Sequence, residues 1–162
     1  MSRLLEGQAV VVTVSDGVSE GTREDISGDA LEKLLVQSGM TVSRRLVPDE
    51  ADQITDVISE SARSARLVVT TGGTGLGVRD VTPEATLEVL EREAPGLMHA
   101  MMAAGLEKTP MAALSRARAG SIGDALVINV PGSPKGAVES LEAIIELLPH
   151  ALQLLSGDNR HH

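Results

Sequence analysis

The chain combines 162 residues and a formal net charge of −9 with a complete lack of Cys, Phe, Tyr and Trp. The length suits one domain with a single core, and the lack of cysteine excludes disulfides, thiolate zinc sites and thiol catalysis while fitting a reducing cytoplasm. Without aromatic rings base stacking is impossible, and the acidic charge disfavours a broad phosphate-binding surface, so we expect no nucleic-acid partner.

The first strand is predicted over QAVVVTVS (Gln8–Ser15), an apolar run rich in β-branched residues that suits burial on both faces of a parallel sheet. A long polar loop, Ser15–Gly28, follows this strand, and loops of such length in compact domains are often functional. The next apolar stripe predicts a helix that ends at Gly39. Its members are Ala30, Leu31, Leu34 and Leu35.

A second strand is predicted over MTVSRRLVP (Met40–Pro48), and a third over RLVVTT (Arg66–Thr71). Between them, an apolar repeat at spacings of three and four predicts an amphipathic helix. The repeat consists of Ile54, Val57, Ile58 and Ala62. After a glycine-rich loop, Thr82 as N-cap, Pro83 at the first helical position and Glu84 in the first turn predict another helix.

The second half of the chain predicts a methionine-rich helix over Gly96–Leu106 and two strands around the turn Ile122–Asp124. The last helix starts with Ser133 as N-cap and Pro134 at its first position. Its apolar face carries Leu141, Ile144, Ile145 and Leu148, and a short helix to Leu155 follows a break at Pro149. Alternating strands and helices predict an α/β three-layer sandwich, a mostly parallel sheet with helices on both faces, with a core over about residues 8–155.

Neither end of the chain predicts a targeting segment. The start MSRLLEGQ is too short and too soon charged for a signal peptide, and no apolar run approaches the ~20 residues of a membrane-spanning helix. We therefore expect a cytoplasmic protein without a membrane partner. The end SGDNRHH is predicted to be a frayed tail, in which His161 and His162 have no assigned function.

The stretch TTGGTGLGVRDVTPEA (Thr70–Ala85) joins a strand, a glycine-rich turn and a helix start, which is typical of an anion cradle. The loop has no lysine, which excludes a Walker A motif. Its glycine spacing, Gly73-Gly75-Gly77, excludes the dinucleotide fingerprint. The structural alternative is a sharp turn without a ligand.

Two aspartates sit at predicted strand or helix ends. Asp80 precedes the helix cap, where it suits Mg²⁺ binding beside a phosphate, or alternatively complements the helix dipole. Asp49 follows the second strand, where ligands of open α/β sheets bind, or alternatively caps the helix at Ala51. We expect both aspartates, Asp16, the glycine loop and PGSPKG (Pro131–Gly136) to line one cleft.

The other polar and methionine residues allow fewer assignments. Lys135, one of three lysines, lies at a helix N-terminus where it suits phosphate binding, or alternatively is a solubilising surface residue. The histidines show no metal-ligand spacing. Met98, Met101 and Met102 are interpreted as core or subunit-contact residues rather than as a ligand site.

These motifs together resemble the MoaB/Mog family of molybdenum cofactor biosynthesis proteins. The resemblance rests on SDG…DISGDAL, LVPDE, TTGGTGLGVRDVTPEA, SRARAG and INVPGSPKGA, in the family's order from about Ala9 to Leu148. The glycine-loop motif is distinctive, although molybdenum insertases and CinA-type proteins share it.

The resemblance implies a single molybdopterin-binding domain over residues 1–162 that assembles as a homotrimer or hexamer. Catalytic members of the family are molybdopterin adenylyltransferases, which transfer AMP from Mg-ATP to the terminal phosphate of molybdopterin and release pyrophosphate. The resemblance therefore implies Mg²⁺, ATP as co-substrate, molybdopterin as substrate, and handover of the product to a molybdenum insertase.

The resemblance also assigns roles to residues. Asp49 matches the family's PDE aspartate and Asp80 its RD aspartate, so both are expected to be catalytic and to orient Mg²⁺, directly or through water. Nucleotide phosphates are expected at Gly72, Gly73, Thr74 and Gly75. The pterin is expected at Ser15, Asp16, Gly132, Ser133, Pro134 and Lys135, and without aromatic rings it must stack on aliphatic or backbone surface.

Two other functions stay open. A non-catalytic molybdopterin-binding or carrier protein would have the same fold, but retention of Asp49 and Asp80 favours the enzyme. A CinA-type hydrolase domain shares the glycine loop, but such domains normally belong to longer chains.

Overall fold

The structure is a computed structural model that describes residues 5–157, and within them the chain forms a six-stranded sheet in the order β2-β1-β3-β6-β5-β4. The strands β2, β1, β3 and β6 run parallel, whereas β5 is antiparallel to β6 and β4 to β5. The strands are β1 (Gln8–Val14), β2 (Thr41–Val47), β3 (Leu67–Thr71), β4 (Arg92–Glu93), β5 (Ala119–Ile122) and β6 (Ala125–Val130). The predicted mostly parallel sheet is confirmed.

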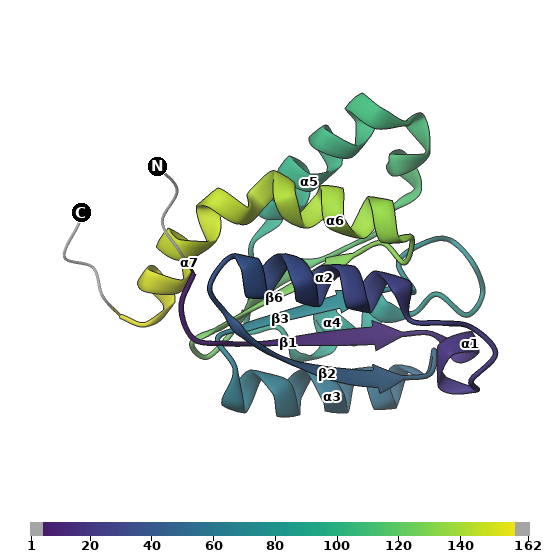
Figure 1. Ribbon diagram of the computed structural model, residues 1–162, viewed down its shortest axis with the longest axis horizontal. Coiled ribbons are helices and arrows are strands. Elements are labelled where there is room, and N and C mark those ends of the chain that lie inside the picture. The colour runs from purple at the N-terminus through teal and green to yellow at the C-terminus, as the bar shows by residue number, and fades with distance from the viewer. Residues whose placement is uncertain (1–4, 158–162) are drawn as a thin grey trace.

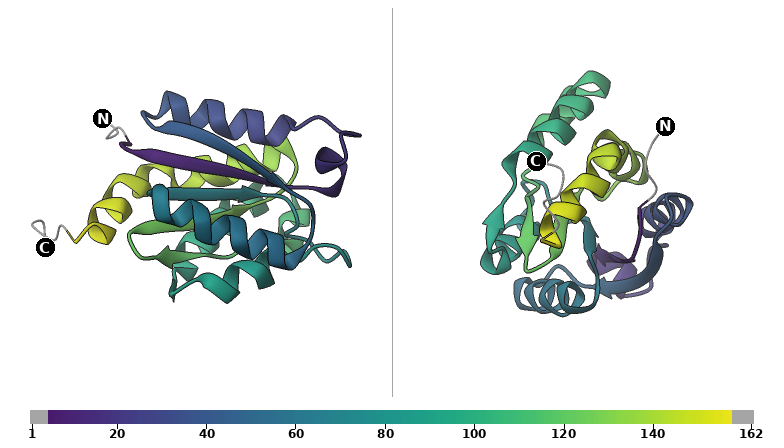
Figure 2. Two further views of the ribbon diagram at one scale, coloured as in Figure 1. Left: turned by 90° about the horizontal axis from the view of Figure 1, so that it is seen from below. Right: turned by 90° about the vertical axis from the view of Figure 1, so that its left-hand side faces the viewer.

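Helices cover both faces of this sheet (Figures 1 and 2). On one face α2 packs beside α6, which packs against α5, while α3 and α4 pack together on the other face. The helices are α1 (Asp16–Ser19), α2 (Ile26–Gln37), α3 (Ala51–Ser64), α4 (Thr82–Val89), α5 (Pro95–Lys108), α6 (Pro134–Ile144) and α7 (Leu148–Leu155), with 3₁₀ turns η1 (Pro110–Leu114) and η2 (Ile145–Leu147). No helix among residues 5–157 is both long and apolar enough to cross a bilayer.

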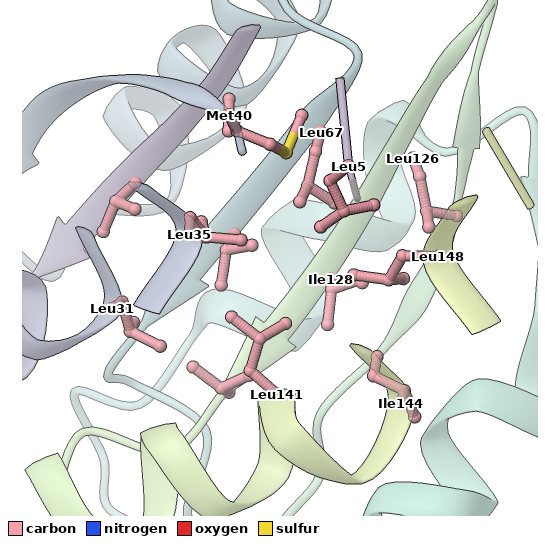
Figure 3. Close-up of a cluster of buried hydrophobic side chains, with 14 of the residues drawn as sticks. Leu5, Leu31, Leu35, Met40, Leu67, Leu126, Ile128, Leu141, Ile144 and Leu148 are labelled. Carbon is pink, nitrogen blue, oxygen red and sulfur yellow. The ribbon is translucent and has the colours of Figure 1, made fainter. Parts of the chain in front are cut away.

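The apolar core has two halves, one on each side of the sheet. Along β1, Val11 points to the half under α2 and α6, whereas Val10 and Val12 point to the half under α3. Figure 3 shows the first half, where Leu31 and Leu35 of α2 approach Leu141 of α6 over β3 and β6. Both faces of β1 and β3 are therefore buried, which fits the apolar residues that make up most of these two strands.

The segment α5–η1 is the part of the molecule that stands away from the sheet (Figure 1). Of the α5 side chains only Met101 is buried, while Leu106 of α5 and Met111 and Leu114 of η1 are exposed. The predicted methionine-rich helix is confirmed, with one residue more at its start and two more at its end. It leaves an apolar surface that the single chain does not cover.

Three local predictions need correction. Thr82 is not the N-cap of α4, because Val81 takes that position and the buried Thr82 hydroxyl donates to the Gly72 carbonyl at 2.9 Å. The loop predicted over Ser15–Gly28 contains α1 and the first turn of α2, which Asp25 caps by accepting the Gly28 N–H. The last helix changes to a 3₁₀ turn at Ile145, because Pro149 has no N–H to donate to the Ile145 carbonyl.

The other predicted elements agree with the structure to within a few residues. Gly39, just beyond α2, has a φ of +107°, and Ser133 caps α6 by accepting the Gly136 N–H at 3.1 Å. His161 and His162 lie outside the described residues.

Candidate functional site

The loops that follow four parallel strands meet in one polar cleft of about 340 Å³, at the α1 end of the sheet (Figure 1). Its walls come from the ends of β1, β2, β3 and β6 and from the start of α2. Its lining includes Ser15, Asp25, Asp49, Gly72, Gly73, Asp80, Gly132, Ser133 and Pro134. The prediction that Asp49 and Asp80 share one cleft is confirmed.

Asp16 and Asp49 tie the ends of β1 and β2 together through a reciprocal pair of bonds. The Asp16 N–H donates to Oδ2 of Asp49, and the Asp49 N–H donates to Oδ1 of Asp16, both at 2.9 Å. The N-cap alternative for Asp49 is wrong, because Glu50 takes that position and no side chain caps α3. The second oxygen of Asp49, Oδ1, accepts no hydrogen bond from the described residues.

The two carboxyl groups of this pair have pKa values shifted in opposite directions. Burial raises the pKa of Asp49, and the negative charges of Asp16 and Asp80 add to this rise, although the bond from the Asp16 amide opposes it. Hydrogen bonds from Arg79 and from the Asp49 amide lower the pKa of Asp16. Asp49 is therefore the acid whose charge the folded protein destabilises.

Arg79 fastens the far end of the glycine loop to this pair. Its Nε and Nη2 contact the two carboxylate oxygens of Asp16 at 3.0 and 3.1 Å, and Nη2 also contacts Glu50 at 3.0 Å. Such a two-point contact fixes orientation as well as distance. Asp80, the next residue, is thereby held near Asp49.

The glycine loop passes so close to its neighbours that two of its positions exclude any side chain. Gly72 has a φ of +104°, and a Cβ there would lie 2.2 Å from the carbonyl oxygen of Val14. Gly73 has a φ of +68°, and its Cβ would lie 2.3 Å from Oγ1 of Thr82 and 3.1 Å from Oδ1 of Asp49. Glycine is needed here both for the backbone conformation and for the close approach to Asp49.

Asp80 folds back over the glycine loop. Its Oδ2 accepts the Gly77 N–H at 2.9 Å, and a Cβ added at Gly75 or Gly77 would come within 3.0 or 2.8 Å of that oxygen. The Asp80 carboxylate accepts no hydrogen bond from a backbone amide of α4. No hydrogen bond therefore supports the alternative that Asp80 complements the α4 dipole. Like Asp49, Asp80 keeps one oxygen, Oδ1, without a partner among residues 5–157.

These two aspartates fit a magnesium ion that is shared with a phosphate ligand. Among the described residues no three His, Cys, Asp or Glu side chains gather as a metal cage would require. Mg²⁺ is commonly held by one or two carboxylates together with phosphate oxygens, so a complete protein cage is not needed. Asp49 and Asp80 each offer one uncommitted hard oxygen to the same cleft.

A second, mostly apolar cavity of about 290 Å³ lies on the other side of the glycine loop, between α5, η1 and α6. It is lined by Thr74, Gly75, Met98, Met101, Met102, Gly105, Thr109, Met111, Ala112, Leu114, Ser115, Ala117, Asn129, Pro131, Ser133, Gly136, Glu139 and Ser140. Met98, Met101 and Met102, predicted to be core or subunit-contact residues, therefore line a cavity, because α5 stands away from the sheet. Ser133 lines both cavities and joins them.

The predicted site residues are therefore divided between several places. Thr74 and Gly75 line the apolar cavity, whereas the glycines before them line the polar cleft. Asp16 lies behind Asp49 and lines neither cavity. Lys135 is exposed and also lines neither, as expected for the surface alternative.

Several residues of the site were missed by the sequence reasoning. Asp25 forms part of the cleft wall and is held by the Thr13 hydroxyl at 2.7 Å and by Arg44, which also contacts Asp29 and Glu32. Arg79, at the end of the glycine loop, contacts Asp16 and Glu50, whereas Arg116 contacts the carbonyls of Gly75 and Asp80 in the loop itself. No local pattern reveals these partners, since each arginine reaches residues far away in the chain.

Comparisons with known proteins match nearly the whole chain. A family model described as "Probable molybdopterin binding domain" matches residues 10–150. The chain is 38% identical over 153 residues to a molybdopterin adenylyltransferase of Helicobacter pylori strain J99, covering 91% of this chain and 87% of that protein. It is 39% identical over 152 residues to the molybdenum cofactor synthesis protein cinnamon of Drosophila melanogaster, covering 91% of this chain but only 25% of that longer protein.

Solved structures show the same fold. The molybdopterin biosynthesis enzyme MoaB from Thermus thermophilus superposes with a TM-score of 0.86 at 48% identity, covering 93% of this chain and 96% of that one. The expected α/β sandwich is thereby confirmed over nearly the whole chain.

Proposed function

The chain belongs to the MoaB/Mog family of molybdenum cofactor biosynthesis proteins, and from this premise we propose that it is a molybdopterin adenylyltransferase. In the proposed reaction, an oxygen of the terminal phosphate of molybdopterin attacks the α-phosphorus of ATP. The bond from that phosphorus to the bridging oxygen breaks, and pyrophosphate leaves. The product is adenylyl-molybdopterin.

One observation carries the proposal: two carboxylates with uncommitted oxygens line the same cleft as Gly72 and Gly73, the start of a glycine loop whose free amides continue to the border of that cleft. The N–H groups of Gly73, Thr74 and Gly75 donate no hydrogen bond within residues 5–157, so they are available to phosphate oxygens. The reaction needs no enzyme nucleophile, because the pterin phosphate is itself one. The protein must instead hold two polyanions together and offset their repulsion.

We assign Asp49 and Asp80 as the residues that would hold Mg²⁺, directly or through water. When bound, the ion supplies charge neutralisation to the phosphate groups. The carboxylates orient the phosphates, and the loop amides hold phosphate oxygens opposite them. Gly72 and Gly73 belong to the nucleotide part of the cleft, with Thr74 and Gly75 at its border to the apolar cavity.

The pterin end is proposed on the β6 side, at Gly132, Ser133 and Pro134, with Ser15 on the opposite wall. Gly132 lies against the glycine loop, since a Cβ there would lie 3.2 Å from the Cα of Gly72. A ligand at Ser133 would therefore lie next to one at the loop, which the transfer requires. Asp16 and Lys135 are proposed to act at the margin of this site, from behind Asp49 and from the start of α6.

Incubation of the purified protein with molybdopterin, ATP and Mg²⁺ tests the proposal. We expect pyrophosphate and adenylyl-molybdopterin in equal amounts, and neither when molybdopterin or Mg²⁺ is omitted. Binding of molybdopterin without pyrophosphate release would instead identify the non-catalytic carrier.

The proposal extends to the assembly, partner and location of the enzyme. The exposed apolar residues of α5 and η1 fit a homotrimer or hexamer. Handover of the product to a molybdenum insertase would follow from the chemistry, since an adenylylated pterin is an activated intermediate. A cytoplasmic location fits the cysteine-free composition.

A further inference from the structure

Arg116, from the SRARAG motif, holds the glycine loop from behind. Its Nε donates to the Gly75 carbonyl and its Nη2 to the Asp80 carbonyl, both at 2.7 Å, while its backbone N–H donates to the Thr74 carbonyl at 2.8 Å. The third guanidinium nitrogen contacts the carboxylate of Glu84 in the first turn of α4. One residue thus binds both ends of the loop and the helix that follows it.

These contacts fix the direction of particular amide groups. In a planar trans peptide the C=O of one residue and the N–H of the next point in opposite directions. The Thr74 and Gly75 carbonyls point to Arg116, so the N–H groups of Gly75 and Leu76 point away from it. Neither N–H donates a hydrogen bond within residues 5–157.

We propose that Arg116 is a positioning residue for the nucleotide phosphates, which acts by fixing the N–H groups of Gly75 and Leu76, just beyond the Gly73 that lines the polar cleft, in the direction away from its own side chain. This inference rests on the proposed function for the identity of the ligand, the polyphosphate of ATP. Arg116 lines neither cavity, so it acts through the loop rather than on the ligand. Consecutive amides that point the same way form a concave anion site.

Arginine suits this task because three acceptors surround it in different directions. The planar guanidinium donates to Gly75, Asp80 and Glu84 at once, whereas a lysine ammonium on a flexible stem has no fixed fork of donors. Replacement by lysine keeps the charge and loses the geometry. The two substitutions Arg116→Lys and Arg116→Gln therefore separate charge from orientation.

The matched control is Arg118→Gln, two residues along the same segment. The side chain of Arg118 contacts Glu93 on the surface at 3.0 Å, and only its backbone N–H, which the substitution retains, donates to Asn129. Thermal melting of all three variants checks that each is folded. If Arg116→Gln does not fold, Arg116→Lys carries the test.

The first measurement follows the loop itself by ¹⁵N relaxation and does not depend on turnover. The Gly75 carbonyl accepts from the Arg116 side chain, so we expect the N–H order parameter of Leu76 to fall from the rigid value of about 0.85 to below about 0.6 in both Arg116 variants. The Thr74 carbonyl accepts from the backbone N–H of residue 116, which both variants keep, so the Gly75 N–H should stay ordered and serves as an internal reference. In wild type and in Arg118→Gln both N–H groups stay rigid, and both resonances shift on titration with Mg-ATP alone. Unchanged order of the Leu76 N–H in Arg116→Gln, or absence of the ATP-induced shifts in wild type, overturns the proposal.

The second measurement compares the two substrates. Since misplacement of ligand groups by about 1 Å costs on the order of 10²-fold, we expect kcat/KM for ATP to fall by that factor, with the KM for molybdopterin unchanged. The positioning role is also overturned if the kinetic constants for ATP and molybdopterin change equally, or if Arg116→Lys has the wild-type kcat/KM for ATP. If wild type shows no turnover, the adenylyl-transfer proposal fails, whereas the relaxation and ATP-titration results still decide the role of Arg116.

Discussion

The polar cleft and the apolar cavity are neighbours of similar size, about 340 and about 290 Å³, yet they are built in different ways. The cleft consists of loops at strand ends, braced by backbone contacts such as the reciprocal bonds of Asp16 and Asp49. The cavity consists of flexible side chains, chiefly methionines, on a helix that stands away from the sheet. The cleft is polar and its loops are hydrogen-bonded to one another, which suits the orientation of phosphates, whereas the methionine-lined cavity offers an adaptable apolar surface.

The sharpest way to break this distinction is Asp80→Asn. Asparagine keeps the shape and can still accept the Gly77 N–H, so the loop should stay in place. Because the charge is lost, adenylyl transfer should fall on the order of 10²–10³-fold, or about 2.7–4 kcal/mol of transition-state stabilisation. Pyrophosphate release and thermal melting, measured together, check this.

Asp124→Asn is a suitable control for this change, since Asp124 is exposed on the β5–β6 turn, at the opposite end of β6 from the cleft. It should leave both turnover and melting temperature unchanged. Wild-type turnover in Asp80→Asn would move the metal assignment to Asp49 alone.

The apolar side of the comparison is tested by Met111→Glu. Met111 is 66% exposed and lines the cavity from η1. If a second subunit covers this surface, a charge there should remove about 1.5–3 kcal/mol of apolar burial from each contact and shift the protein toward monomers in light scattering. Titration of the separated monomer with Mg-ATP should still show binding, because the polar cleft is left intact.

A wild-type monomer at micromolar concentration would contradict the assembly prediction. Loss of Mg-ATP binding in folded Met111→Glu would show that the two cavities are not independent.

The pH dependence sharpens the description of the cleft. Burial raises the pKa of Asp49 above its usual 3.8. Metal and phosphate binding requires the charged form, so turnover should decline about tenfold per pH unit below this raised pKa, starting at a higher pH than for an exposed aspartate. A pH profile of kcat/KM in the wild type checks this.

The same shift predicts the sign of a stability effect. The pKa of Asp49 is higher in the folded than in the unfolded state, so the folded state binds the Asp49 proton more tightly. Ionisation of Asp49 therefore lowers the free energy of unfolding as pH rises from 3.8 through the folded pKa. The protein remains destabilised by this charge at neutral pH. Asp49→Asn should therefore inactivate the enzyme while leaving the melting temperature at pH 7 unchanged or higher. A lower melting temperature at pH 7 would show that the charge stabilises the fold.

The sheet was predictable because its signals are local. The runs around β1 and β3 are apolar on both faces, and Ser133-Pro134 has the composition of a helix start. The meeting of Asp49 and Asp80 in one cleft also follows, because parallel strands place their carboxyl ends on one edge.

The supporting contacts were not predictable, because their partners are distant in the chain. Arg116 lies 41 residues from Gly75, and Arg79 lies 63 from Asp16. Threonine is a common N-cap residue, yet the Thr82 hydroxyl donates to the Gly72 carbonyl instead. This acceptor comes within reach only when the glycine loop is folded against α4. The roles of the predicted ligand-binding residues stay predictions until a ligand is bound.

The smallest effect is expected at Glu84→Gln, a residue that lines neither cavity. Its carboxylate contacts Arg116, which lowers the pKa of Glu84, so the ion pair stabilises the fold above about pH 4.5 and loses this effect as pH falls through the lowered value. The side chain is 58% exposed, and glutamine can still accept from the guanidinium, whose other contacts to Gly75 and Asp80 persist. Exposed ion pairs contribute little, so adenylyl transfer should change by no more than about threefold. A loss as large as that of Asp80→Asn, in a variant that melts like wild type, would place Glu84 among the groups that act on the phosphates and would extend the polar site onto the first turn of α4.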